Sequence, residues 1–325
     1  MDPPVPLVRV VRSGLEESVH LGDVVVCDAS GRVVASAGDP ERPVYARSSL
    51  KPLQAAVSLS SIGDEVPPEL LAIMCASHNG EPRHVDAVRR LLRAGGVPVA
   101  ALRCPEDLPS RRRDAAAAPG PRRIFHNCSG KHAGMLRACT ARAWDLETYR
   151  ARTHPLQRAV AAAVRKATGV ARPHVGVDGC GVPVFGVPLR AMATLFARLA
   201  DPSSLGRLEA DVRASVTAMR AHPFLVAGTG RADTAIMQHA PGVIAKVGAE
   251  ALFCAADLGR GLGVAVKIAD GGDRASGAVL VEALRAIDAI DDGQRERIDV
   301  VARRPILGGG EPVGEMRVEV PLSAP

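Results

Sequence analysis

Ser48 and Lys51 are the two residues whose types and spacing most directly suggest chemistry. They stand in the stretch YARSSLKP, residues 45–52. The apolar residues that follow have helical spacing, so the two side chains are predicted to lie one turn apart on one face. A serine hydroxyl becomes a nucleophile when a base takes its proton, and a lysine can be that base if burial or a nearby cation keeps it neutral. The pattern predicts nucleophilic attack by Ser48 with Lys51 as base.

Lysine is scarce in this chain, and this scarcity gives the pair more weight. Of the 41 Lys and Arg residues only five are lysines, so the other 36 are arginines. Arginine cannot release its proton near neutral pH, whereas lysine can. Taken alone, the S-x-x-K spacing is still a weak signal. The structural alternative is an N-capping serine beside a solvated lysine.

Two further short motifs extend this pattern. S-x-N occurs at residues 77–79, and K-x-G occurs at residues 246–248 on a predicted strand. With the first pair they follow the order of the S-x-x-K, S-D-N and K-T-G elements of serine β-lactamases and penicillin-binding proteins. The interval between Lys51 and Ser77 is short for those enzymes. A turn-capping role for Ser77 and an ordinary strand-edge lysine at Lys246 therefore stay open as alternatives.

A second group of reactive side chains contains thiols. The stretch HNCSGKH places Cys128 and Lys131 three positions apart, and the later stretch DGCG contains Asp178 and Cys180. Two thiolates and a nitrogen donor can hold zinc and leave a coordination position open. Lysine is a rare ligand because its amine must first lose a proton. From spacing alone, a glycine-rich active-site loop with two buried cysteines is favoured over a metal site.

Composition limits the possible classes of protein. The 325 residues are 47% hydrophobic, which is enough for a large core in one domain or two lobes. With 2% aromatic residues, stacking platforms for single-stranded nucleic acid are nearly absent, and the net charge of +6 is dispersed, so no nucleic-acid partner is expected. No apolar run approaches the roughly 18 residues of a membrane span, so we expect a cytoplasmic protein without a membrane partner. Seven irregularly spaced cysteines fit reduced thiols.

The order of predicted elements points to an α+β protein. Strands are predicted at 6–11, 19–28, 32–37, 243–247, 262–269 and 316–320, with a turn at 28–31. Helices are predicted from about Ser48, at 67–80 and 82–94, from Gly130 onward, and at 149–168, 189–200, 204–222, 231–239 and 276–290, and a mobile surface loop at 110–123. The pattern predicts a single catalytic domain, 1–325, of two lobes. The sheet lobe would contain about 1–46 and 240–325, and the helical lobe about 47–239.

Motifs along nearly the whole chain resemble those of the asparaginase II family, the thermolabile, rhizobial-type L-asparaginases. They are RSSLKPLQ (47–54), CASHNGE (75–81), HNCSGKHAGML (126–136), HPLQ (154–157), VDGCGVPVF (177–185), AGTGRADTAIM (227–237), AKVGAE (245–250) and VAVKIADGG (264–272). The resemblance implies a serine β-lactamase-like fold, usually as a homodimer, with an antiparallel sheet built from both chain ends and a helix-rich middle lobe. It also implies hydrolysis of L-asparagine to L-aspartate and ammonia.

The resemblance also assigns roles to individual residues. It implies two Ser-Lys tandems, which are Ser48 with Lys51 and Ser77 with Lys246. It further implies a zinc site with the ligands Cys128, Lys131 and Cys180, which reverses the preference for a metal-free loop drawn from spacing alone. The substrate-binding residues it implies are Arg47, Asn79 and Asp178. One departure is Ala251, where the family pattern leads us to expect glycine. This change removes no reactive group.

Two other functions remain compatible with these residues. A β-lactam or D-alanyl-peptide hydrolase is favoured by the motif order but disfavoured by the lack of a signal peptide, since those substrates lie outside the cytoplasm. A non-catalytic protein that binds zinc or an amino acid would use the cysteines and leave Ser48 and Lys51 without a role. Ammonia release from asparagine separates the predicted function from both alternatives.

Overall fold

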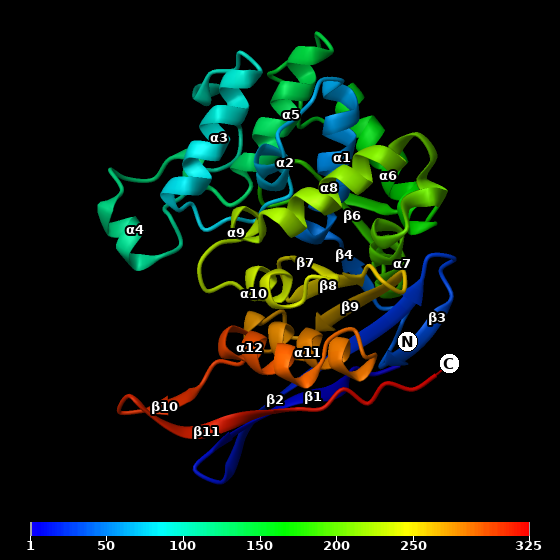
Figure 1. Ribbon diagram of the computed structural model, residues 1–325, viewed down its shortest axis with the longest axis vertical. Coiled ribbons are helices and arrows are strands. Elements are labelled where there is room, and N and C mark those ends of the chain that lie inside the picture. Colours follow the sequence, from blue (N-terminus) through cyan, green and yellow to red (C-terminus); the bar gives the residue numbers. More distant parts are fainter. Residues whose placement is uncertain (1, 325) are drawn as a thin grey trace. The chain divides into compact units, whose positions relative to one another are not determined.

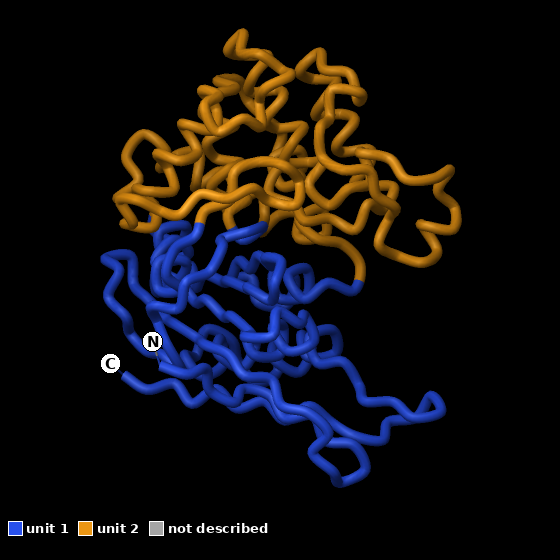
Figure 2. Tube along the Cα trace, turned by 180° about the vertical axis from the view of Figure 1, so that it is seen from behind, with its two compact units in different colours: residues 1–49, 186–201, 230–325 blue, residues 50–185, 202–229 orange. Residues whose placement is uncertain are grey.

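The computed structural model describes residues 2–324, which form two compact units (Figure 2). Of these residues, unit 1 comprises 2–49, 186–201 and 230–324, and unit 2 comprises 50–185 and 202–229. Residues 47–49, 186–201 and 230–239 belong to unit 1, although they were predicted to lie in the helical lobe. That the chain is a single catalytic domain stays a prediction.

Unit 1 is built on an eight-stranded antiparallel sheet. The strand order is β10-β11-β1-β2-β9-β8-β7, and β3 pairs with β2. The strands are β1 (Val5–Arg12), β2 (Leu15–Asp28), β3 (Val33–Ala37), β7 (Val243–Val247), β8 (Leu252–Asp257), β9 (Leu262–Ile268), β10 (Ile306–Gly308) and β11 (Glu311–Val318). Strands from both ends of the chain alternate in this order, which confirms the predicted α+β class and the antiparallel sheet assembled from both chain ends.

Helices cover both faces of this sheet (Figure 1). Unit 1 contains α7 (Leu189–Ala200), α10 (Ala232–His239), α11 (Asp273–Ala286) and α12 (Asp292–Ala302). Val264 and Val266 of β9 share a hydrophobic core with α11. Side chains alternate along a strand, so the intervening Gly263 faces the other side, where a Cβ atom would lie 2.0 Å from the Ala193 carbonyl oxygen of α7. The glycine therefore allows α7 to lie directly on the sheet.

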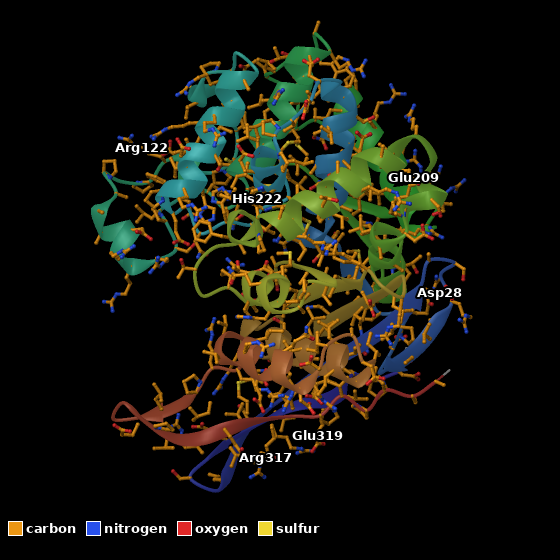
Figure 3. All side chains as sticks on the ribbon, in the orientation of Figure 1. Asp28, Arg122, Glu209, His222, Arg317 and Glu319 are labelled. Carbon is orange, nitrogen blue, oxygen red and sulfur yellow. The ribbon has the colours of Figure 1, made fainter. Side chains whose placement is uncertain are left out.

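The turn between β2 and β3 shows how local sequence sets this topology. Asp28, labelled in Figure 3, accepts hydrogen bonds through Oδ1 from the backbone N–H groups of Ser30 at 3.0 Å and Arg32 at 3.1 Å. Gly31 has a φ of +93°, a conformation that favours glycine. The predicted turn at 28–31 is confirmed.

Unit 2 is mainly helical, as predicted for the middle of the chain. Its helices are α1 (Lys51–Ile62), α2 (Pro68–Met74), α3 (Pro82–Ala94), α4 (Arg112–Ala117), α5 (Ser129–Ala141), α6 (Pro155–Thr168), α8 (Glu209–Ala221) and α9 (Pro223–Val226). Short 3-10 helices lie at η2 (Val99–Ala101), η3 (Arg123–Phe125) and η4 (Pro202–Leu208), and strand β5 at His174–Val177. Strand β6 (Pro183–Pro188) crosses the unit boundary, and its last three residues pair with β4 (Pro43–Tyr45) in unit 1.

Helix α5 lies at the centre of unit 2, and its residues 129–139 are all buried. Gly130 permits this position, because a Cβ atom there would lie 2.1 Å from the carbonyl oxygen of Ile73 in α2. A similar restriction applies at Gly134, where a Cβ atom would lie 2.8 Å from the Met74 side chain. Two glycines therefore bring α5, which carries Lys131, against α2.

Three local predictions are wrong. The segment 110–123 is not a structureless loop, because it contains α4. The helix predicted to end at Gly80 ends at Met74, since the following backbone turns away and the Ser77 N–H donates to the Val226 carbonyl at 2.9 Å. The last predicted strand, 316–320, is shifted, since β11 ends at Val318. Strand β8 and helix α12 were not predicted.

Candidate active site

The predicted site residues are divided between the two units, and each set is described within its own unit. Unit 1 contains Arg47, Ser48 and Lys246. Unit 2 contains the remaining predicted residues, which are Lys51, Ser77, Asn79, Cys128, Lys131, Asp178 and Cys180. Except for Arg47, Ser48 and Asp178, all of these side chains are buried.

Ser48 lies in a short 3-10 helix, η1 (Arg47–Leu50), which continues directly into α1 at Lys51. The predicted helical start near Ser48 is therefore confirmed. Arg47 has a φ of +43°, a left-handed conformation that is uncommon for a residue with a side chain. Such strain tends to occur at functional sites. Here it is in the residue immediately before Ser48, at the sharp entry into helical structure.

Lys51 is 1% exposed and its amine is surrounded by oxygen atoms. Nζ donates to the carbonyl oxygen of Ala76 at 2.6 Å and to that of Asn127 at 3.4 Å, and it lies 2.8 Å from Ser77 Oγ. Burial lowers the pKa of Lys51 below its usual value, and the charge of Lys131 lowers it further. The structure thus brings together Lys51 and Ser77, one residue from each of the two predicted tandems.

Lys246 is fully buried on β7 in unit 1. Its Nζ donates to the Val247 carbonyl oxygen at 3.0 Å and lies 3.8 Å from Asp233 Oδ2 of α10. Ser49 Oγ donates to the Lys246 carbonyl oxygen at 2.9 Å, which ties η1 to β7. Ser49 and Asp233 were not predicted as site residues, although both lie within motifs that carry the family resemblance.

The three predicted metal ligands gather in unit 2. Lys131 Nζ donates to Cys180 Sγ at 3.0 Å, and both side chains are buried together with Cys128. A hydrogen bond with Cys180 is the main cause that lowers the pKa of Cys128 well below its usual value, while the same contact raises the pKa of Cys180. Burial opposes the charge on Lys131, but Cys180 and Cys128 more than offset it and raise the lysine pKa. The cluster therefore favours one thiolate beside one ammonium group.

This donor set fits zinc, which accepts nitrogen and sulfur ligands. The fit depends on Lys131 losing its proton, as metal binding generally requires of its ligands. Among residues 2–324, no group of three or more His, Cys, Asp and Glu side chains is placed to hold a metal ion. A zinc site here would therefore need the lysine amine beside the two thiols.

Asp178 lies beside this cluster at the start of a tight turn. Its Oδ2 is 3.7 Å from Cys180 Sγ, and its carboxylate contributes to the raised pKa of Lys131. The Asp178 N–H donates to the Val182 carbonyl at 2.9 Å, and Gly181 has a φ of +86°. The turn accounts for the spacing of the DGCG motif, because it presents Cys180 toward α5.

His132 is a further residue of this region, and it was not predicted as a site residue. It follows Lys131 on α5, and its Nδ1 lies 2.6 Å from the Tyr149 hydroxyl. Its Nε2 is buried without a hydrogen-bond partner in the described part of the chain. Burial lowers the pKa of His132 to about 4, so the ring is neutral at ordinary pH. Its place in the HNCSGKH stretch was the available signal.

The sequence of the chain matches a known enzyme family. The family model described as L-asparaginase II matches residues 8–318, nearly the whole chain. The chain belongs to the L-asparaginase II family. This membership confirms the resemblance drawn from the motifs and supports an asparaginase-type, hydrolytic activity on a small molecule. Among curated proteins, the comparison finds no match.

Solved structures add less. A β-lactamase from Mycobacterium bovis is similar at 16% sequence identity, covering 83% of this chain and 95% of that chain, with a TM-score of 0.42. A similarity this low gives no basis for argument, so the serine β-lactamase-like arrangement stays a prediction beyond the α+β class. Within residues 2–324, no helix combines the length and apolar character needed to cross a membrane.

Proposed function

We propose that this protein is an L-asparaginase that hydrolyses the side-chain amide of L-asparagine to L-aspartate and ammonia. Membership of the L-asparaginase II family supports the reaction class. The observation that carries the chemistry is the contact of a buried lysine amine, Lys51 Nζ, with a serine hydroxyl, Ser77 Oγ, at 2.8 Å. A buried lysine with a lowered pKa is suited to act as a base.

The surroundings of Lys51 suit the neutral amine. A neutral amine has two N–H groups and one lone pair. The carbonyl oxygens of Ala76 and Asn127 can only accept hydrogen bonds, so they take the two N–H groups. The lone pair is then available to a serine O–H. We propose that it receives the proton of the attacking serine.

Ser48 is the proposed nucleophile, because it stands one helical turn before Lys51 and follows the strained Arg47. Its Oγ attacks the side-chain carbonyl carbon of asparagine while Lys51 takes the hydroxyl proton. Lys51 then passes this proton, through Ser77 in contact with its amine, to the leaving nitrogen. The nitrogen departs as ammonia and leaves an ester on Ser48. Water then attacks the ester with Lys51 as base. Lys51 returns the proton taken from water to Ser48 Oγ as the ester bond breaks, and L-aspartate leaves.

The remaining predicted roles are proposals too. Lys246 would serve the proton relay, and Arg47, Asn79 and Asp178 would bind substrate. When bound at Cys128, Lys131 and Cys180, zinc would supply a cation for the substrate's α-amino or carboxylate group, which holds the substrate in position. We also propose that the protein is a homodimer and is located in the cytoplasm.

The test is ammonia release from L-asparagine, L-glutamine and a chromogenic cephalosporin by the wild type, Ser48→Ala and Ser77→Ala. We expect release from asparagine, loss of turnover and of any acyl-enzyme in Ser48→Ala, and slower turnover with an acyl-enzyme in Ser77→Ala. If Ser77→Ala alone abolished acylation, the two serines would exchange roles. Cleavage of only the cephalosporin, or asparagine binding without ammonia release, would refute the asparaginase proposal.

A further inference from the structure

Two motifs that carry the family resemblance meet within unit 2, and only Ser77 and Asn79 of their residues have a role in the proposed function. The stretch 75–81, CASHNGE, lies beside the stretch 226–229 at the start of AGTGRADTAIM. The N–H groups of Ser77 and Asn79 donate to the carbonyl oxygens of Val226 and Ala227, both at 2.9 Å. This backbone pairing aligns the S-x-N motif with a segment about 150 residues later in the chain.

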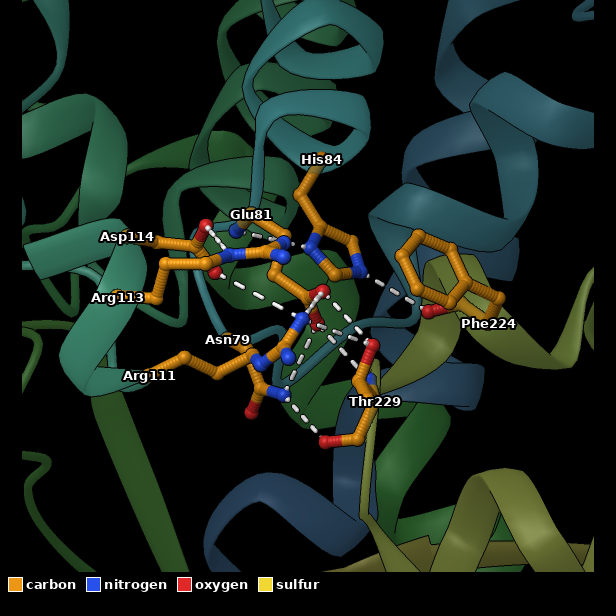
Figure 4. Close-up of polar contacts among 8 residues, drawn as sticks. All are labelled: Asn79, Glu81, His84, Arg111, Arg113, Asp114, Phe224 and Thr229. Atoms are coloured by element: carbon orange, nitrogen blue, oxygen red, sulfur yellow. Dashed lines mark hydrogen bonds and ion pairs between the residues drawn. The ribbon is translucent and has the colours of Figure 1, made fainter. Parts of the chain in front are cut away.

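A single buried carboxylate fastens the two stretches together. Glu81 is 5% exposed, and its Oε1 accepts from the Thr229 N–H at 2.8 Å and from Asn79 Nδ2 at 3.1 Å. Its Oε2 accepts from Thr229 Oγ1 at 2.8 Å and from Arg111 Nη1 at 2.9 Å (Figure 4). Both carboxylate oxygens are therefore used twice, by donors from three separate parts of the chain.

Gly228 makes this close approach possible. A Cβ atom at this position would lie 2.5 Å from Glu81 Oε1 and 2.7 Å from Asn79 Nδ2. Its φ of +120° is also a conformation that residues with a side chain rarely adopt. The glycine in the AGTG stretch thus serves the contact with Glu81.

The carboxylate fixes the orientation of the Asn79 amide. Besides its bond to Glu81, Asn79 Nδ2 donates to the Thr229 carbonyl oxygen at 3.0 Å. Both N–H groups of the amide are then used by acceptors, and a flipped amide would place its oxygen against them. The other polar atom, Oδ1, can only accept, and it is directed away from Glu81 (Figure 4).

We propose that Glu81 is a positioning residue, which holds the Asn79 amide so that its carbonyl oxygen accepts an N–H of the substrate's α-ammonium group. The inference rests on the proposed function, since it concerns the substrate of the same site. The contact with Asn79 selects for substrates with a free α-amino group, because an acylated α-nitrogen would offer one N–H and no positive charge.

The charge on Glu81 supports this arrangement. Burial acts to raise its pKa, but the hydrogen bonds from Thr229, Asn79 and Arg111 more than offset burial and lower the pKa to about 2. Glu81 is therefore ionised at every pH at which an assay is practicable. A glutamine at this position must replace one carboxylate oxygen with an NH₂ group. That group would face either the N–H donors of Thr229 and Asn79 or the N–H donor of Arg111.

The first arm of the test is kinetic and compares Glu81→Gln with Glu69→Gln. Glu69 also pairs with an arginine of unit 2, Arg90 at 2.7 Å, but lies on the surface and outside the site. We expect Glu81→Gln to raise KM for asparagine about 10-fold or more, with kcat within about 3-fold, since a hydrogen bond to a charged group is lost. Glu81→Asp should recover part of the loss, and Glu69→Gln should match the wild type.

The second arm needs no substrate. The chain has only two asparagines, Asn79 and Asn127, so selective ¹⁵N labelling gives two side-chain amide pairs in an NMR spectrum. We expect slow solvent exchange of the Asn79 amide in the wild type and at least about 10-fold faster exchange in Glu81→Gln, with Asn127 as internal reference. Should Glu81→Gln fail to fold, Thr229→Val removes the Oγ1 bonds to Glu81 and Arg111 but keeps the backbone N–H, and it should give a smaller shift in the same direction.

The outcomes separate the two proposals. Faster Asn79 exchange together with a raised KM supports the positioning role. Unchanged exchange, or faster exchange with an unchanged KM, overturns it. If the wild type releases no ammonia, the proposed function fails, while the exchange arm still decides whether Glu81 orients the amide.

Discussion

Two buried lysines of unit 2, Lys51 and Lys131, show how different neighbours give one residue type opposite properties. Both are almost fully buried, at 1% and 3% exposed. Burial is the largest influence on Lys51 and lowers its pKa, and the thiols of Cys128 and Cys180 oppose this without reversing it. At Lys131 burial has the same effect, but the two thiols and Asp178 reverse it and the pKa rises.

The difference indicates which lysine can do which task. Lys51 contacts two carbonyl oxygens and a hydroxyl, and its hydrogen bond with Cys128 raises its pKa less than burial lowers it, so the neutral form is favoured. Lys131 donates directly to Cys180 Sγ, so the charged form is favoured until a metal replaces its proton. Burial favours the neutral lysine at both positions, and the acidic thiols outweigh burial only at Lys131.

The largest expected effect follows from replacing Lys51. Lys51→Met should lower kcat for asparagine roughly 10³-fold or more, because the base that takes the serine proton is lost. Lys51→Arg should be as inactive, since arginine keeps its proton. The matched control is Lys166→Met, an exposed lysine on α6. Activity of Lys51→Arg within about 10-fold of the wild type would show that the residue acts as a cation.

Removing the other lysine should have a smaller effect of a different kind. Lys131→Met, Cys180→Ser and chelation should each raise KM about 10- to 100-fold while kcat stays within about 3-fold, as expected for loss of a substrate-positioning group. Steady-state kinetics beside zinc content measured by mass spectrometry checks this. A zinc-free wild type with an unaltered KM would remove the metal from the proposal, and a collapse of kcat as steep as in Lys51→Met would erase the contrast.

The contrast also depends on the packing that brings α5 against α2. Gly130→Ala should lower the free energy of unfolding by about 1–3 kcal/mol, because its Cβ would lie 2.1 Å from the Ile73 carbonyl oxygen. Gly293→Ala on α12 is the control, since its nearest neighbour would be at 3.4 Å. That change should stabilise by up to about 1 kcal/mol through helix propensity. Urea unfolding measures both, and stabilisation by Gly130→Ala would contradict the close packing.

Local signals predicted much of the fold. The turn at 28–31 followed from Asp28 and Gly31, and the helix α3 from apolar spacing. Strand β8, LFCAAD, was missed because it is buried on both faces and so lacks the alternation that marks a half-exposed strand. The α-helical turn of α4 was missed since its arginines and alanines have no apolar face to pack.

The site was predictable to the extent that its residues lie in short motifs. Ser48 with Lys51, and Cys128 with Lys131, are neighbours in the sequence. The contact of Lys51 with Ser77 joins residues 26 positions apart, and that of Glu81 with Thr229 joins residues 148 apart. No spacing rule predicts such contacts. At Ala251 the family pattern predicts a glycine that the chain does not have. Its φ of +54° is a conformation that favours glycine, yet alanine occupies the position.

The most direct test of the central claim is to measure the two lysine pKa values by NMR. With only five lysines in the chain, selective ¹³Cε labelling gives a spectrum in which Lys51→Met and Lys131→Met assign the two signals. In zinc-free protein, Lys51 should titrate below the usual 10.5 and Lys131 should remain charged above it. A Lys51 that stays protonated up to 10.5 would contradict its role as the base, whatever the activity of the variants.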